Sequence, residues 1–279
     1  MLEGGHRQSA RAPVAFGAVD SPTEHAVPTA GATPPGRAVG RSFVLHALGG
    51  WITAQVVGSV AVALALFAAT PTGTAVGTAV AAVLDGAGDP DVIAGLTVGT
   101  FTLVVLPGWI AQLGAVASAT WGAGRSVVDT LGLRFRASDV PVGLAAGVAA
   151  QVLVGLLYRL VDVDAGAPAT RLLAKADTPG AAVTMAVLLV GVAPFVEELV
   201  YRGLLQRGLG AYVDARFALV VTAVVFAVVH FQTVQFAGLL VAGLVFGGLA
   251  QWSGRLGPAI VAHVGFNATT VGWMLLVGS

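Results

Sequence analysis

Long runs of apolar residues constrain this chain more than any other feature. Seven runs are long enough, or nearly so, to cross about 30 Å of hydrocarbon as helices that rise about 1.5 Å per residue. They cover residues 43–69, 92–119, 140–161, 181–203, 216–231, 236–252 and 257–278, of which the fifth and sixth are short. Charged residues make up only 10% of the sequence, against roughly 25% in soluble domains. The sequence therefore predicts an all-α, polytopic bundle of about seven transmembrane helices in a cell membrane.

Composition divides the chain into three segments. Residues 1–41 are rich in Pro, Gly, Ala and Ser, so we expect a disordered cytoplasmic tail. Residues 42–124 hold the N-terminal transmembrane helices, and residues 125–279 hold the helices that carry the polar motifs described below. Because the first apolar run begins only near Phe43, we expect no cleaved signal peptide. Arg37 and Arg41 precede that run, and the bias of arginines over the loops predicts a cytoplasmic N-terminus and an external C-terminus.

Charge and cysteine content exclude several classes of function. The formal net charge is zero, so no basic face is available for a nucleic acid. The absence of cysteine removes disulfides, thiolate metal ligands and a thiol nucleophile. The strings G-x-S-x-G and H-E-x-x-H are absent. A GxGD string at 86–89 lies in a Gly/Pro turn, which favours a solvated loop. Arginine greatly outnumbers lysine among many Ala, Val and Gly residues, which is typical of a GC-rich bacterial genome.

The stretch 196–203 places three ionisable residues at the end of an uncharged apolar run. A charge at membrane depth costs roughly 2.5–3.5 kcal/mol on insertion scales and marks a functional site. On a helix Glu198 and Arg202 are i, i+4 neighbours and can pair, whereas Glu197 lies about 100° around the axis. We therefore expect one carboxylate to be held by an arginine and the other to be available.

Two later runs carry further polar residues. Phe226 and His230 lie near the end of the fifth run, and His263 and Asn267 share a helical face on the seventh. Without partners their burial would cost several kcal/mol, so we expect them to contact one another and the glutamates. Taken singly, a histidine or asparagine in a membrane helix more often forms a structural hydrogen bond to a neighbouring helix. Together with the paired glutamates they indicate a functional site.

The ordered set Glu-Glu-x-x-x-Arg, Phe-x-x-x-His and His-x-x-x-Asn resembles the CPBP family. That family comprises the type II CAAX prenyl endopeptidases and bacterial relatives linked to bacteriocin processing and immunity. The motifs are intact as Glu197/Glu198/Arg202, Phe226/His230 and His263/Asn267, and the resemblance covers residues 125–278. It implies an intramembrane endopeptidase that acts on a membrane-associated peptide or protein.

The chemistry of peptide hydrolysis agrees with this resemblance, because it needs an activated water, a proton acceptor and oxyanion donors. We assign activation of the water to Glu197 and His230, and stabilisation of the oxyanion to His263 and Asn267. Glu198 and Arg202 would position the fourth helix, with Glu198 also aiding proton transfer, and Phe226 would support the site.

A metal centre is the competing chemistry. Glu197, His230 and His263 would form a zinc ligand set that leaves a position for water. The sequence leaves open whether the cofactor is none or a single divalent metal, with Zn²⁺ the most plausible ion. The metal-free version is slightly favoured because it gives tasks to Glu198 and Asn267.

Helix geometry adds a requirement. Glu197 and His263 lie about 9–15 Å from the predicted cytoplasmic ends of their runs, and His230 lies roughly 20 Å in. They meet only if the fifth helix tilts or begins outside the bilayer, so we expect a hydrophilic pocket that opens toward the cytoplasm. The pairs Gly143/Gly147 and Gly243/Gly247 predict close helix packing.

Two other classes of function remain open. One is a non-catalytic bacteriocin-immunity or scaffold protein of the same fold. The other is a proton-coupled transporter, which intramembrane Glu and His also support, but the sequence shows no convincing internal repeat.

Overall fold

The computed structural model describes residues 49–53, 56, 58, 60, 98–122, 126–162, 176, 178–230 and 232–277. The chain divides into the units Met1–Pro35 and Gly36–Ser279, and every described residue lies in the second. These residues form helices and turns with no strand among them, which confirms the all-α prediction. The predicted tail, most of the first run and the 86–89 loop lie outside the described residues.

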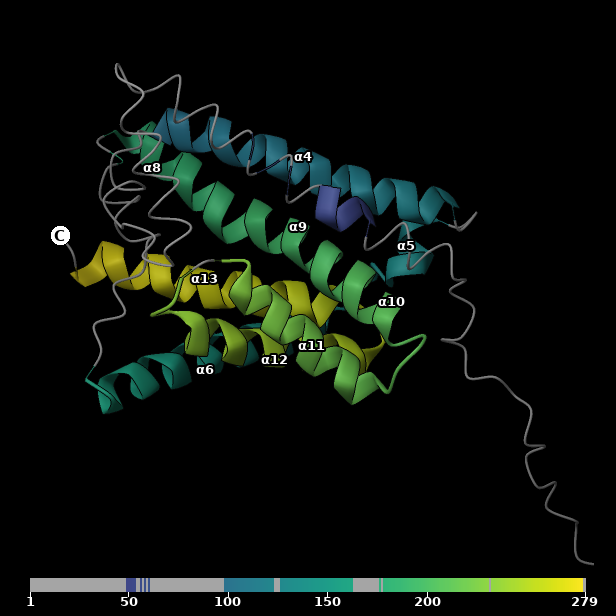
Figure 1. The fold of residues 1–279 in the computed structure, drawn as a ribbon. Coiled ribbons are helices and arrows are strands. Elements are labelled where there is room, and N and C mark those ends of the chain that lie inside the picture. Colours follow the sequence, from purple (N-terminus) through teal and green to yellow (C-terminus); the bar gives the residue numbers. More distant parts are fainter. Residues whose placement is uncertain are drawn as a thin grey trace, which may run out of the picture. The chain divides into compact units, whose positions relative to one another are not determined.

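Apart from α5, the described helices follow the predicted runs (Figure 1). Six of them are α4 (Val98–Gly122), α5 (Val127–Leu131), α6 (Asp139–Leu160), α11 (Ala215–Val228), α12 (Phe236–Ser253) and α13 (Gly257–Val277). The fourth run forms one long helix, Pro179–Leu209, which is longer than the predicted 181–203. Within the described residues, α6, the long helix and α12 are long and apolar enough to cross a membrane, and α11 is apolar but shorter. The total of seven spans stays a prediction.

The long helix changes its hydrogen-bonding pattern four times. It consists of α8 (Pro179–Ala186), the π-helix η1 (Val187–Val192), α9 (Ala193–Glu198), the π-helix η2 (Leu199–Gln206) and α10 (Arg207–Leu209). π-Helical segments inside α-helices are rare and frequently lie at functional sites. Both flank the short α9, which ends at the two glutamates.

Capping residues fix several helix boundaries. Thr178 accepts a hydrogen bond from the backbone N–H of Ala181 and is followed by Pro179, a residue suited to the first helical turn. The Asp214 carboxylate accepts from the backbone N–H of Arg216 at 2.8 Å and so begins α11. Gly254, with φ 68°, ends α12 in the left-handed conformation that favours glycine.

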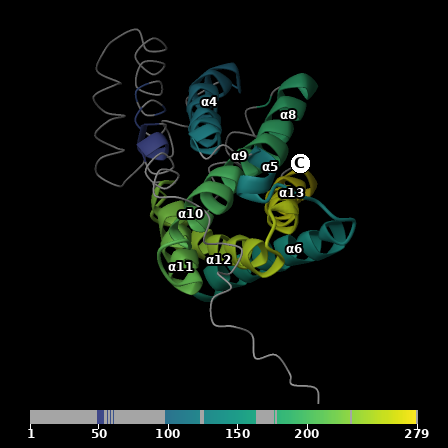
Figure 2. The ribbon, with the colours of Figure 1, turned by 90° about the vertical axis from the view of Figure 1, so that its right-hand side faces the viewer.

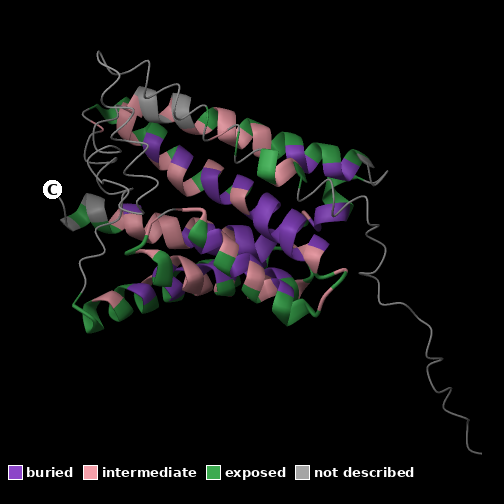
Figure 3. Ribbon diagram, in the orientation of Figure 1, coloured by how far each residue is buried: buried purple, intermediate pink, exposed green. Residues whose placement is uncertain are grey.

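Several helices pack against the α9–η2 part of the long helix. α13 contacts α6, α12, η1 and α9, while α11, α12 and α4 contact η2 (Figure 2). Buried residues concentrate where these helices meet, and green exposed positions are seen at the visible end of α6 (Figure 3). The exposed α6 residues include Val148, Val152 and Leu156, an apolar surface suited to lipid. The glutamates therefore lie in the part of the long helix that these helices contact.

Glycines allow the closest helix contacts, as the small-residue pairs predicted. Gly147 of α6 lies against the Ala262 backbone of α13, where an added Cβ would overlap the Ala262 carbonyl oxygen. Gly243 of α12 lies against Ala223 of α11, with a built Cβ at 3.1 Å from the Ala223 Cα. The α6–α13 contact lies one residue from His263 and so helps to set its position.

Polar interactions join two connecting segments and the last turn of the long helix at one end of the described helices. The backbone N–H of Leu256 donates to the Gly132 carbonyl at 2.8 Å, and Arg207 Nη2 donates to the Gly254 carbonyl at 3.0 Å. Arg255 forms an ion pair with Asp139, whose side chain is 2% exposed. Segments that were predicted to be cytoplasmic thus lie at the same end, while the side of the membrane stays a prediction.

Candidate active site

The buried half of the site is an ion pair within the long helix. Glu198 Oε1 lies 3.0 Å from Arg202 Nη1, and both residues are almost completely buried. Arg202 Nη2 also donates to the Gly243 carbonyl at 3.1 Å, and its guanidinium lies 4.6 Å from the Phe226 ring centroid. The predicted pairing of Glu198 with Arg202 is confirmed.

Glu198 also orients His263. Its Oε1 lies 2.9 Å from His263 Nδ1, so the hydrogen-bond network assigns a proton to Nδ1, which donates to the carboxylate. The His263 ring stacks on Phe246 at a centroid distance of 4.5 Å and meets the edge of Phe226 at 5.9 Å. A carboxylate and two aromatic rings therefore hold this imidazole in one orientation.

Glu197 is the accessible carboxylate. Its side chain is 19% exposed, against 0% for Glu198, and its Oε2 lies 3.7 Å from His263 Nε2. That distance is too long for a direct hydrogen bond, and a water beside both atoms could contact each of them. The geometry separates the two glutamates as the sequence predicted, one held and one available.

His230 lies in a turn rather than on a helix. The predicted fifth run extends to residue 231, but α11 ends at Val228 because the chain turns there toward the polar 232–235 link. His230 Nδ1 lies 2.6 Å from the Phe226 carbonyl oxygen, which can only accept, so Nδ1 carries the proton and Nε2 of the neutral ring is an acceptor. The ring packs on Phe226 at 4.6 Å, and no direct contact joins it to Glu197. Phe226 thus contacts both histidine rings.

Asn267 binds a backbone carbonyl of the long helix. Its Nδ2 donates to the Leu189 carbonyl oxygen at 2.8 Å, and the side chain is partly buried. Asn267 follows His263 by one turn of α13, so two neighbouring turns bind the long helix through side-chain hydrogen bonds.

The predicted zinc ligands do not form a metal centre as they are placed. Glu197 and His263 approach each other, but His230 makes its described contacts with Phe226. Among the described residues, no three His, Cys, Asp or Glu side chains are arranged to hold a metal ion. The donor geometry therefore does not fit the three-ligand set.

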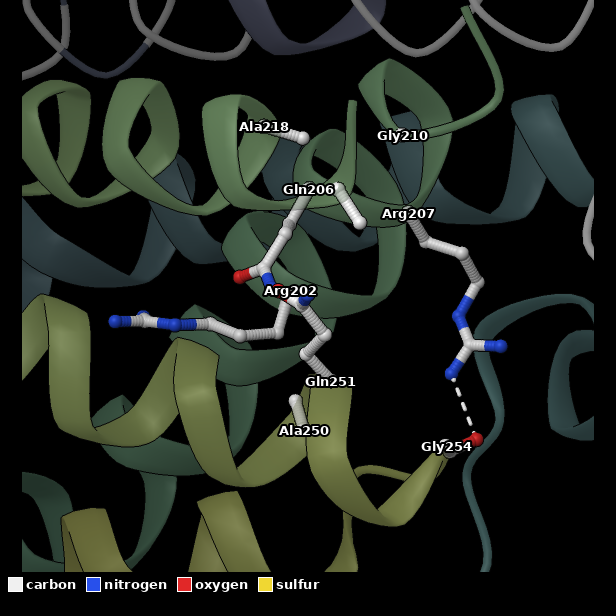
Figure 4. Close-up of a pocket in the computed structure, with 9 residues that line it drawn as sticks. Arg202, Gln206, Arg207, Gly210, Ala218, Ala250, Gln251 and Gly254 are labelled. Carbon is white, nitrogen blue, oxygen red and sulfur yellow. Dashed lines mark hydrogen bonds between the residues drawn. The ribbon is translucent and has the colours of Figure 1, made fainter. Parts of the chain in front are cut away.

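A cavity of about 210 Å³ lies next to the ion pair, at the end of the long helix. Figure 4 shows Arg202, Gln206 and Arg207 around it, with Arg207 reaching the Gly254 carbonyl. None of the five predicted catalytic residues lines this cavity, so the expected hydrophilic pocket around them stays a prediction.

Two residues that pack beside Arg202, His263 and the glutamates were not identified from the sequence. Gln206 continues the row of Glu198 and Arg202, and its Nε2 donates to the Gly247 carbonyl at 3.0 Å. Its spacing of four residues from Arg202 was a signal that could have identified it. Phe246, which stacks on His263, lies in an apolar run that offers no comparable signal.

Comparison with known proteins supports the motif-based resemblance. The family model described as "Type II CAAX prenyl endopeptidase Rce1-like" matches residues 179–269. Residues 179–269 are therefore similar to an Rce1-like domain. The matched stretch contains Glu197, Glu198, Arg202, Phe226, His230, His263 and Asn267. No curated protein and no solved structure matches the chain. The match and the apolar helices together indicate a membrane protein that is similar to CAAX-type proteases.

Proposed function

We propose that this protein is an intramembrane endopeptidase that hydrolyses a peptide bond in a membrane-associated peptide or protein. The observation that carries the proposal is the arrangement around His263. Its Nδ1 is bound by the buried Glu198, and its Nε2 faces the partly exposed Glu197 at 3.7 Å. A carboxylate near an oriented imidazole, inside an apolar helix bundle, provides a site for an activated water.

Glu197 acts as the general base in this proposal. It takes a proton from the water as the water oxygen forms a bond to the peptide carbonyl carbon, and the proton then passes to the leaving amine as the C–N bond breaks. Glu197 is 19% exposed and approaches His263 only at 3.7 Å, whereas Glu198 is fully buried and its Oε1 is shared by Arg202 and His263. Glu198 thus acts through His263 and is a positioning residue.

Both histidines contact Phe226, and each of them takes part in activating the water in this proposal. The contact distances favour His263 over His230 as the group beside Glu197, although the sequence assigned the water to Glu197 and His230. His230 presents an accepting Nε2 in its neutral form, which suits its predicted role of polarising the water together with Glu197. No step requires a metal ion.

Reconstitution of the full chain in liposomes with a library of membrane-associated peptides tests the proposal. Wild type should cleave at least one peptide, and Glu197→Ala and His230→Ala should each lose cleavage by at least about 100-fold, the usual contribution of general acid–base groups. Treatment with a chelator should leave the wild-type rate unchanged. Loss of cleavage on chelation would favour the metal alternative, while a cellular phenotype retained in Glu197→Ala would favour a non-catalytic immunity or scaffold role.

A further inference from the structure

The η1 segment contains a carbonyl that its own helix cannot pair. In an α-helix the Leu189 carbonyl would accept from the N–H of residue 193, but the Ala193 N–H donates to the Leu188 carbonyl in the π pattern. In that π pattern Leu189 would accept from residue 194, which is proline and has no N–H. Neither helical pattern therefore supplies a donor to the Leu189 oxygen.

Asn267 supplies the missing donor from another helix. Its Nδ2 lies 2.8 Å from the Leu189 oxygen, 78 residues away in the sequence. An unpaired carbonyl away from water is costly, and in an apolar bundle few other donors can reach it. The contact therefore replaces the hydrogen bond that Pro194 removes.

We infer that Asn267 is a positioning residue that keeps η1 in its π pattern and so sets the register between the long helix and α13. The inference rests on the proposed function insofar as that register governs catalysis. Asn267 and His263 lie one turn apart on α13, and both bind the long helix, at Leu189 and at Glu198. Loss of the hydrogen bond between Asn267 and the Leu189 carbonyl would let α9 shift against α13. The 3.7 Å distance between Glu197 Oε2 and His263 Nε2 would then change.

The proline gives the test a matched background. Pro194→Ala restores a backbone N–H at the position that faces the Leu189 oxygen in the π pattern, so it should make Asn267 dispensable for that carbonyl. The four proteins to compare are wild type, Asn267→Ala, Pro194→Ala and the double variant. Pro194 is fully buried, so Pro194→Val, which fills more of the ring's space, replaces Pro194→Ala if the latter does not fold.

Hydrogen–deuterium exchange of the amides in 187–195, measured on the full chain in detergent, is the readout that needs no substrate. Asn267→Ala should raise exchange there by on the order of tenfold, the factor that corresponds to about 1.4 kcal/mol. In the Pro194→Ala background the same change should raise exchange by less than about twofold. Equal increases in both backgrounds, or none in either, would overturn the inference.

Turnover of a cleaved peptide gives the second readout. Asn267→Ala should lower kcat with little change in KM, and Pro194→Ala should restore most of the lost kcat. If Asn267 instead acted only as an oxyanion donor, kcat would fall equally in both backgrounds and exchange would not change. Failure of wild type to cleave any peptide would count against the proposed function alone, because the exchange measurements would still decide the role of Asn267.

Discussion

The two adjacent glutamates should divide into one that stabilises the fold and one that reacts. Glu198 has no exposed surface and binds Arg202 at 3.0 Å and His263 at 2.9 Å. Removing one partner of a buried ion pair costs about 3–5 kcal/mol, because the remaining charge stays buried without compensation. We expect Glu198→Ala to lower the free energy of unfolding by that amount.

Thermal denaturation of the purified chain in one detergent measures the effect. For a chain of this size each kcal/mol moves Tm by about 2–4 °C, so Glu198→Ala should lower Tm by roughly 6–20 °C. Glu197→Ala is the matched control, one residue away and with a 19% exposed side chain. It should change stability by no more than about 1 kcal/mol while it abolishes cleavage.

A double-mutant cycle with Arg202→Met separates the ion pair from simple loss of packing. In that background Glu198 has lost its arginine, so Glu198→Ala should cost at least about 2 kcal/mol less than in wild type. Equal Tm shifts for Glu197→Ala and Glu198→Ala would refute the reasoning. So would a free-energy cost of Glu198→Ala that is the same in the Arg202→Met background as in wild type.

Two further predictions use controls within the same chain. Gly147→Ala should cost about 1–3 kcal/mol and reduce cleavage, because its Cβ would meet the Ala262 carbonyl next to His263, whereas Gly155→Ala on the same helix has open space and should be neutral or slightly stabilising. Thermal denaturation and peptide cleavage check both, and equal effects would count against the packing argument. Asp139→Asn should cost about 2–4 kcal/mol because it breaks the buried pair with Arg255, while Asp129→Asn should cost under about 1 kcal/mol because its pair with Arg134 is largely exposed. Similar Tm values for these two variants would contradict that ranking.

The apolar runs predicted the helices well because a segment that crosses hydrocarbon must satisfy its backbone internally, which leaves few choices besides a helix. The pairing of Glu198 with Arg202 was also predictable, since it needs only the i, i+4 spacing and the cost of an unpaired charge. These two features depend on local sequence and on the membrane as solvent.

Contacts that depend on how helices meet could not be predicted in the same way. The uncharged η1 gives no periodicity that would separate a π-helix from an α-helix, and the four-residue spacing of Glu198, Arg202 and Gln206 fits an α-helix, so neither η1 nor η2 was expected. The link between Asn267 and Leu189 required knowledge of both the π pattern and the partner helix. The turn at His230 replaced a predicted helix end, since the apolar run continues past the point where α11 stops.

Solvent labelling tests the central claim most directly. Wild type and Glu197→Gln in liposomes, given the same cleaved peptide in ¹⁸O-labelled water, report both the source of the new carboxylate oxygen and the need for the Glu197 base. We predict one labelled oxygen in the wild-type product, cleavage at least about 100-fold slower in Glu197→Gln, and Tm values within about 2 °C of each other. Cleavage at the wild-type rate by a folded Glu197→Gln, or products without label, would contradict the account.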